Sequence, residues 1–160
     1  MTANQDGLLL QPSQGTSFWV LGDLYTFKAV GKDTGEVYAL FEILVQSPNP
    51  ALPYIHSLED KAFYVLEGEI EFQLDDRTIV AIAGTFLHSP KGQLHSFKNA
   101  GSKPAKMLCW VMPAGLEEFF AEVGSSVKEQ FSGPPPVSPT DIERVMATAP
   151  NYGIEIIESN

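Results

Sequence analysis

Three histidines carry most of the chemistry that this sequence offers. His56, His88 and His95 all fall between residues 56 and 95. Imidazoles bind transition metals, and they act as general acids and bases near neutral pH. The single Cys109 lies in the apolar run MLCWVM, which favours a buried, inert thiol over a nucleophile and excludes an intramolecular disulfide. The histidines are therefore the starting point for a candidate site.

Charge and composition exclude several classes of partner. The 160 residues include 10 Lys and Arg against 20 Asp and Glu, for a formal net charge of −10. Such a chain has no surplus of cations to release the counterions of a phosphate backbone or an anionic lipid surface. We therefore expect neither nucleic acid nor membrane as a partner. The N-terminal segment has no basic start and only three consecutive leucines, so we expect a cytoplasmic protein rather than a secreted one.

Short β-rich runs separated by turn signals make up the first two thirds of the chain. Val, Tyr, Phe and Ile dominate these runs, and residues 69–74 alternate apolar and polar side chains as a half-buried strand does. The expected strands are 18–21, 24–30, 37–45, 62–66, 69–74, 78–83, 85–89, 95–98 and 105–112. The sequence GKDTGE between the second and third predicts a turn and a β-hairpin. This pattern is typical of a β-sandwich or barrel.

Beyond Pro113 the pattern changes to helices. Residues 116–123 place apolar side chains at helical spacing, and Gly124 is a natural stop. A Pro-rich linker follows, and residues 138–141 provide capping residues and an early proline for a second helix over 142–149. The closing GIEIIES is apolar and β-branched, which predicts a strand at a sheet edge. We expect this extension to dock on the barrel.

Two segments around the histidines resemble the sequence motifs of the cupin superfamily. The spacing of Gly84, Pro90, Gly92, His95 and Asn99 fits the second motif at all five positions. The segment YIHSLEDKAFYVLEGEIEF is similar to the first motif, and the likeness extends over most of the chain to single-domain bacterial cupins described as quercetin dioxygenase-like. The resemblance implies one all-β domain over residues 1–160. Its jelly-roll β-barrel core would span about 18–112, and a C-terminal helical extension would span about 113–160.

The sequence departs from the family at two positions that matter for metal binding. In many cupins the first motif supplies two His and one Glu, and the second supplies a further His, to bind Fe, Mn, Ni or Zn. Here Tyr54 takes the first His position and Lys61 takes the Glu position, so only His56 and His95 remain. An imidazole pair is a weak site because most catalytic metal centres offer at least three protein ligands. A Lys61 ammonium in the same cavity would also repel a cation.

Three interpretations of this remnant stay open. His56 and His95 bind a divalent transition metal together with the Tyr54 phenolate or with His88. Alternatively, the histidines are buried polar residues of a core or pocket, and Tyr54 packs as an ordinary aromatic. In the third interpretation, His56, Lys61 and Tyr54 perform metal-free acid–base chemistry after burial has shifted their pKa values. Tyr54 and Lys61 are accordingly the candidate catalytic residues.

Other side chains are assigned by their position in the predicted strands. Glu59 and Asp60 precede the strand that holds Lys61, and we interpret them as solvated turn charges. Several aromatic and apolar residues have the spacing of a barrel lining that would suit an apolar or aromatic ligand. These residues are Phe63, Val65, Phe72, Phe86 and Phe97, of which Phe63, Phe72 and Phe97 are the candidate ligand-binding set.

Two function hypotheses follow. By resemblance, the first is a metal-dependent dioxygenase-like enzyme that acts on an aromatic or flavonoid-like compound. The second is a barrel that has lost metal catalysis and binds a small molecule as a sensor or carrier. We also expect a homodimer, because barrels of this kind leave a sheet edge and an apolar sheet face to be covered, with the strand around 18–21 as a natural pairing edge.

Overall fold

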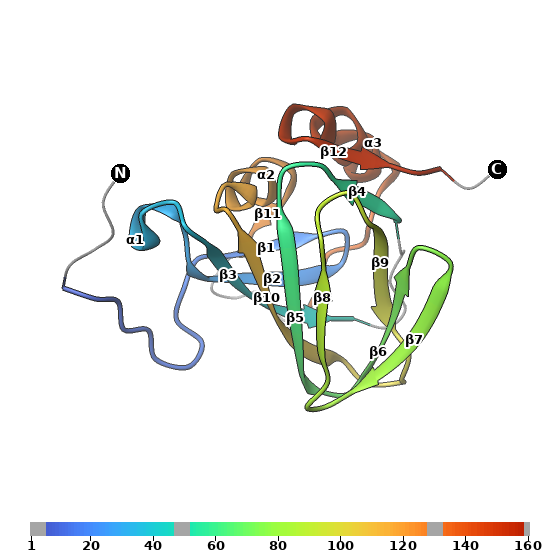
Figure 1. Ribbon diagram of the computed structural model, residues 1–160, viewed down its shortest axis with the longest axis horizontal. Coiled ribbons are helices and arrows are strands. Elements are labelled where there is room, and N and C mark those ends of the chain that lie inside the picture. Colours follow the sequence, from blue (N-terminus) through green and yellow to red (C-terminus); the bar gives the residue numbers. More distant parts are fainter. Residues whose placement is uncertain (1–5, 47–51, 128–132, 159–160) are drawn as a thin grey trace.

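A computed structural model of the chain describes residues 6–46, 52–127 and 133–158. Its strands form two antiparallel sheets that face each other as a jelly-roll barrel (Figure 1). The seven-stranded sheet has the order β11 (Ser125–Ser126), β1 (Ser17–Val20), β2 (Asp23–Ala29), β3 (Ala39–Val45), β10 (Ala105–Met112), β5 (Asp60–Glu67) and β8 (Phe86–Ser89). The five-stranded sheet has the order β12 (Ile154–Ile156), β4 (Tyr54–His56), β9 (Leu94–Asn99), β6 (Glu69–Leu74) and β7 (Arg77–Ile82). The predicted all-β barrel is confirmed.

Strict alternation of burial shows which face of each strand lines the interior. Every second residue of β3 and of β10 is buried, beginning at Ala39 and at Ala105. Phe41 and Met107 are fully buried, and they belong to one apolar cluster between the sheets. Side chains on a strand point to opposite faces in turn, so this pattern fills the barrel and leaves the other face outside. The prediction for Phe86 was wrong, because this ring lies on the outside of β8 and is 63% exposed.

The predicted hairpin between the second and third strands is present, but its turn is partly helical. Residues Gly31–Thr34 form one helical turn, α1, and Gly35 ends it in the left-handed conformation with φ of 67°. Strands β2 and β3 on either side pair antiparallel. Glycine adopts positive φ without the steric cost that a side chain would bring, which explains why the chain reverses here.

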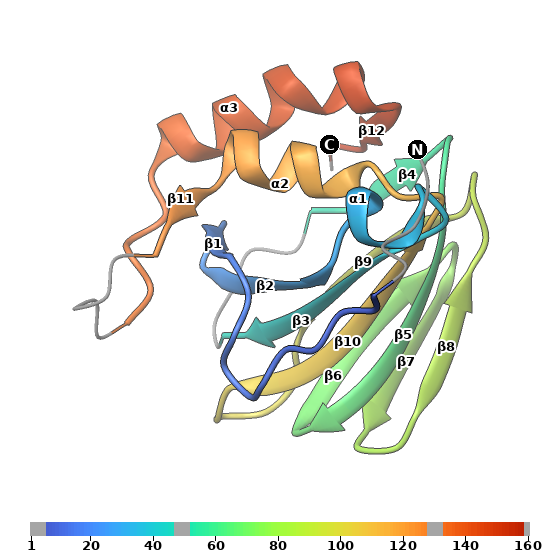
Figure 2. The same ribbon diagram turned by 90° about the vertical axis from the view of Figure 1, so that its left-hand side faces the viewer.

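The C-terminal helices cover one end of the barrel. Helix α2 (Leu116–Val123) buries Leu116, Phe119, Phe120 and Val123, and α3 (Pro139–Thr148) packs beside it. Two views at right angles place both helices above the same end of the sheets (Figure 1, Figure 2). A 3₁₀ turn, η1 (Ala149–Tyr152), leads into β12, which pairs with β4. The expected docking of the extension is confirmed. Among the helices of the described ranges, none is long and apolar enough to cross a membrane.

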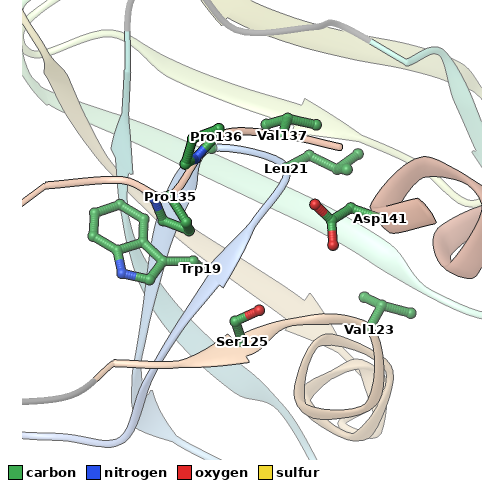
Figure 3. Close-up of a pocket in the computed structure, with 9 residues that line it drawn as sticks. Trp19, Leu21, Val123, Ser125, Pro135, Pro136, Val137 and Asp141 are labelled. Carbon is green, nitrogen blue, oxygen red and sulfur yellow. The ribbon is translucent and has the colours of Figure 1, made fainter. Parts of the chain in front are cut away.

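The N-terminus of α3 is stabilised by its cap, and it lies beside a small pocket at the end of the barrel. The Ser138 side chain accepts a hydrogen bond from the backbone N–H of Asp141, and the Asp141 carboxylate accepts one from the N–H of Ser138. This reciprocal pair satisfies backbone donors that the first helical turn leaves free. Trp19 of β1 lines the adjoining pocket together with the prolines that precede the helix (Figure 3). The extension is therefore held at both the cap and β1.

The N-terminal strand does not provide the free edge that we expected for a dimer. Strand β1 pairs with β2 on one side and with β11 on the other, so its backbone groups are already engaged. In the described part of the seven-stranded sheet, the outermost strands are β11 and β8. Any sheet extension by a second copy would therefore have to use another edge.

Candidate functional site

Strands β4, β5 and β9 bring the predicted site residues together inside the barrel. Tyr54 on β4 lies opposite His95 on β9 in the antiparallel register. The centroids of the His56 and His95 rings are 5.1 Å apart, and the Tyr54 ring lies 6.0 Å from His56 and 6.2 Å from His95. His56, Lys61 and His95 are only 4%, 5% and 2% exposed. Four of the five predicted catalytic and metal-binding residues therefore share one buried site.

The turn that precedes β9 directs His95 inward. Gly92 has a φ of 86°, and the N–H of Gln93 donates to the carbonyl of Pro90 over 3.1 Å. The N–H of Gly92 also donates to the carbonyl of His56 over 2.8 Å. This last bond ties the two histidine segments together through their backbones. It places the backbone of His56 next to the turn that precedes His95.

Asn99 connects two loops at the other end of β9. Its side-chain amide donates to the carbonyl of Val45 over 2.9 Å and to the carbonyl of Lys103 over 2.7 Å. The N–H of Gly101 donates to its Oδ1 over 2.7 Å. Asn99 therefore secures the loop that follows β9 against the end of β3.

Lys61 places an amine in the interior next to both histidines. Burial lowers the pKa of its ammonium, because the charged form loses hydration. Burial is also the main reason why the pKa of His95 is lowered to about 3 and that of His56 falls further; the charge of Lys61 adds to both shifts. Both imidazoles are therefore neutral at physiological pH. The site combines neutral imidazoles with an amine that burial drives toward its uncharged form.

Glu59 corrects the prediction of a solvated turn charge. Its side chain is buried, with the residue 6% exposed, and its Oε2 lies 3.5 Å from Nδ1 of His56. Burial raises the pKa of this carboxyl group, and the charge of Lys61 opposes that shift. Asp60 behaves differently: its exposed carboxylate accepts a hydrogen bond from the N–H of Lys91 over 2.8 Å. The residue that sequence reasoning missed is thus a buried acid beside His56.

Glu59 could have been found from its spacing. It precedes Lys61 by two residues, and side chains two apart on an extended chain point to the same side. Lys61 had already been placed in the interior by its position in the motif. The turn at Ser57 and Leu58 hid this signal, because both residues are exposed and directly precede Glu59.

Three polar atoms of the site lack hydrogen-bond partners among the described residues. They are Nδ1 of His56, Oε2 of Glu59 and Nε2 of His95. Buried polar groups are nearly always paired with protein or with ordered water, and leaving one unpaired costs about 1–3 kcal/mol. Two of these atoms, Nδ1 of His56 and Oε2 of Glu59, face each other at 3.5 Å, and Nε2 of His95 belongs to the neighbouring ring.

The structure places His88 apart from the other histidines. On the β5–β8 ladder, Lys61 lies opposite Ser89, and both side chains are buried. His88 is the neighbour of Ser89, so its side chain points to the other face of the sheet, where it is exposed. The structure thus gives no support to His88 as a third metal ligand beside His56 and His95.

The three predicted ligand-binding aromatics form a connected group beside the histidines. Phe63 and Phe72 have ring centroids 5.2 Å apart and are almost completely buried, which is typical of core packing. The Phe63 ring also lies 6.2 Å from that of His95. Phe97 is partly buried and lines the cavity next to Lys61. Only Phe97 of the three therefore borders open space.

The cavity at the site is small and closed by the C-terminal extension. Its volume is about 20 Å³, which is room for about one water molecule. Polar and aromatic groups of the barrel form one side, and α2, α3 and β12 form the other. The lining residues are Val20, Tyr25, Tyr54, His56, Lys61, Phe97, Phe119, Phe120, Val145 and Ile154. A ligand larger than water would have to displace part of this cover.

The donor set does not fit a divalent metal ion. Within the described ranges, no three His, Cys, Asp or Glu side chains are grouped closely enough to hold one. Lys61 occupies the place of an acidic ligand, and neither its ammonium nor its neutral amine supplies negative charge. Tyr54 remains a phenol, because burial raises its pKa further above the ordinary value.

Comparison with known proteins gives one family and one curated relative. Residues 40–111 match the cupin domain family. The chain is 28% identical over 120 residues to quercetin 2,3-dioxygenase of Bacillus subtilis strain 168, covering 72% of this chain and 34% of that protein. The chain therefore spans about a third of the length of this relative.

Solved structures with the same fold include two informative ones. An RmlC-like cupin from Shewanella frigidimarina aligns with a TM-score of 0.61 and 16% identity, over 74% of this chain and 99% of that one. The Fe(II) form of HppE aligns with a TM-score of 0.59 and 16% identity, over 69% of this chain and 62% of that one. At this identity the likeness concerns the fold.

Proposed function

Since the chain belongs to the cupin superfamily, we propose that it is a small-molecule-binding cupin whose site works without a bound metal ion. The fold alone does not choose among functions, because function depends on the site. The observation that carries the proposal is the buried Lys61 beside His56 and His95.

Electrostatics argue against a metal at this position. With an effective dielectric constant of about 20, an ammonium and a divalent cation about 5 Å apart repel each other by roughly 7 kcal/mol. Deprotonation of Lys61 removes this repulsion but still leaves the site without the carboxylate charge that attracts a cation. Two neutral imidazoles would then be the main donors, and structural or catalytic metal centres usually need at least three ligands.

The same residues suit a small polar ligand. Lys61 and Tyr54 offer an amine and a phenolic hydroxyl to the cavity, and Phe97 and Phe119 offer apolar walls. A few convergent polar groups on an apolar lining are typical of small-molecule sites. The unpaired atoms of His56, Glu59 and His95 would gain partners when the ligand is bound. A sensor or carrier role is the simplest outcome of such binding.

Metal content tests the proposal directly. The protein would be purified without chelator or nickel resin, incubated in turn with Fe(II), Mn(II), Ni(II) and Zn(II), and desalted before elemental analysis. We expect far less than one equivalent of any metal per chain. One tightly held equivalent in the wild-type protein would contradict the proposal.

A second candidate function is a metal-dependent, dioxygenase-like enzyme acting on an aromatic or flavonoid-like compound. The similarity to quercetin 2,3-dioxygenase favours it, as does the Glu59 carboxyl group 3.5 Å from His56, which adds an acidic group near the imidazoles. Oxygen uptake in the presence of quercetin and each metal would support this candidate if the variant Glu59→Gln abolished it. Equal rates with wild-type protein and with metal alone would exclude it.

A further inference from the structure

Lys61 is the one amine that the described residues place inside the barrel, and it lies where acid and base groups converge. The residue is 5% exposed and lines the cavity with Tyr54 and His56. Its charge interacts with Glu59 and with both site imidazoles. His56 and Glu59 approach each other through Nδ1 and Oε2 at 3.5 Å, and Nε2 of His95 has no hydrogen-bond partner among the described residues, so acid and base groups gather at this end of the cavity.

We propose that Lys61 forms a reversible imine with a small aldehyde or ketone, so that the ligand class of this cupin is a carbonyl compound. This inference rests on the proposed function, because it needs a site that holds a small molecule and no metal ion. It also explains why an amine stands in the cavity where a carboxylate would serve metal binding.

The environment of Lys61 provides both requirements of a nucleophilic lysine. The amine must be unprotonated to attack a carbonyl carbon, and burial lowers its pKa toward that state. Water must be kept away from the product, because imines hydrolyse. Val20, Phe119, Val145 and Ile154 form the apolar cover of the cavity and restrict water to about one molecule.

The neighbouring groups balance the protons of the reaction. The Nζ lone pair of Lys61 forms a bond to the carbonyl carbon, and the carbonyl oxygen receives the proton that the nitrogen releases, which gives a carbinolamine. The C–O bond then breaks as the nitrogen lone pair forms the C=N bond. In its protonated form Glu59, whose carboxyl pKa is raised by burial, would donate the proton with which the hydroxyl leaves as water. The products are a cationic iminium, a Glu59 carboxylate and one water molecule.

Glu59 and His56 can serve the proton transfers that imine formation and hydrolysis require. The carboxylate formed on Glu59 is stabilised by the positive charge of the iminium, since opposite charges attract strongly in a poorly hydrated interior. Nδ1 of His56 lies 3.5 Å from Oε2 of Glu59 and can take part in returning the proton when the imine is hydrolysed. No oxidant or reductant is needed, because imine formation is a condensation.

Reductive trapping tests the proposal. Pyruvate, a small ketone, would be added to the full chain at about pH 7.5 together with sodium cyanoborohydride, which reduces an iminium to a stable secondary amine. Intact mass and peptide mapping then give the number and position of adducts. At this pH roughly one in a thousand exposed lysine side chains is deprotonated. A free amine at Lys61 should therefore react at least about ten times faster than an exposed lysine does.

Two variants serve as matched controls. Lys61→Met keeps the length of the side chain and removes the nucleophile, whereas Lys98→Met makes the same change at a half-exposed lysine whose partner is Glu71. A third variant, Phe119→Ala, opens the cover of the cavity to water and should slow trapping at Lys61, because it weakens the burial that lowers the pKa of the amine. Thermal unfolding of each variant establishes that it is folded.

The outcomes separate this inference from the function on which it rests. A single adduct on Lys61 that is lost in Lys61→Met and kept in Lys98→Met supports the imine. Labelling that is slow and evenly spread over exposed lysines overturns it, and so does an unchanged adduct in Lys61→Met. If pyruvate or acetaldehyde raises the unfolding temperature without trapping, the site binds small molecules and only the imine is refuted. If the protein holds one equivalent of metal, the proposed function itself fails.

Discussion

Acidification from about pH 7.5 to about pH 5 should destabilise this protein through its two buried histidines. Both imidazoles are neutral in the folded chain, because burial and the charge of Lys61 hold the pKa of His95 at about 3 and that of His56 lower still. In the unfolded chain each histidine has a pKa near 6.5 and takes up a proton. The stabilisation is therefore fully present above about pH 6.5 and is lost progressively as the pH falls toward 3.

The expected loss follows from proton linkage. At about pH 5, the difference between a pKa of 6.5 in the unfolded chain and about 3 in the folded chain lowers the free energy of unfolding by about 2 kcal/mol for His95. His56 adds about the same amount, which makes about 4 kcal/mol in total. Glu59 opposes this loss, since its raised pKa means that the folded chain gains its proton first. The contribution of one histidine is therefore best isolated by a variant.

Urea unfolding at the two pH values, followed by tryptophan fluorescence, measures this contribution. His95→Gln removes the buried imidazole, and His88→Gln makes the same substitution at an exposed position. We expect His88→Gln to lose as much stability as the wild-type protein on acidification. His95→Gln should lose about 2 kcal/mol less, because it has one buried imidazole fewer.

One result would refute the reasoning. If His95→Gln loses as much stability on acidification as the wild-type protein and His88→Gln do, then His95 is not held neutral by the fold. The lysine-containing interior described above would then have to be solvated or charged differently. The comparison requires the same m-value, the slope of the unfolding free energy against urea concentration, in all three proteins. A change in this slope alters the free energies extrapolated to zero urea.

Four further predictions can be checked independently. Tyr54→His combined with Lys61→Glu should create a three-His, one-Glu set that binds one equivalent of transition metal, as measured by elemental analysis. Each single variant should bind less metal than the double variant. A double variant that folds but holds no metal would contradict this prediction. Lys61→Met should raise the free energy of unfolding in urea by about 1 kcal/mol or more, since it removes a buried amine; a loss would contradict it. Ser138→Ala should lower that free energy by about 1 kcal/mol through loss of the α3 cap, measured against Ser102→Ala in an exposed loop. Light scattering should give a mass twice that of one chain. The variant Phe86→Asp, on the exposed outer face of β8, should reduce the measured mass to that of one chain. A monomeric wild-type protein would exclude the dimer.

Strand and helix positions could be predicted because their signals are local. Residues 69–74 alternate apolar and polar side chains, and the structure has a strand over the same range. Residues 116–123 show helical spacing and form α2. In both cases one face is buried and the other is not, which is the property that the sequence pattern records.

The site could be predicted only in part, because its remaining residues depend on register and on loop conformation. Ser89 faces the interior opposite Lys61, and this pairing turns His88 outward. No single-sequence pattern gives that register before the strands are paired. Glu59 lies two residues before Lys61, a spacing that favours a shared face, but the exposed turn residues directly before it hide this signal.

The pairing of β12 with β4 bears on how the site is assembled during synthesis. Strand β4 carries Tyr54 and His56, yet one of its two neighbours is made from residues 154–156. The hydroxyl of Ser57 donates to the carbonyl of Gly153 across 96 positions of sequence. Contacts of such long range form late, because the loop between them must first be closed. A nascent chain on the ribosome would therefore fold most of its barrel first and complete the pocket only when β12 has emerged.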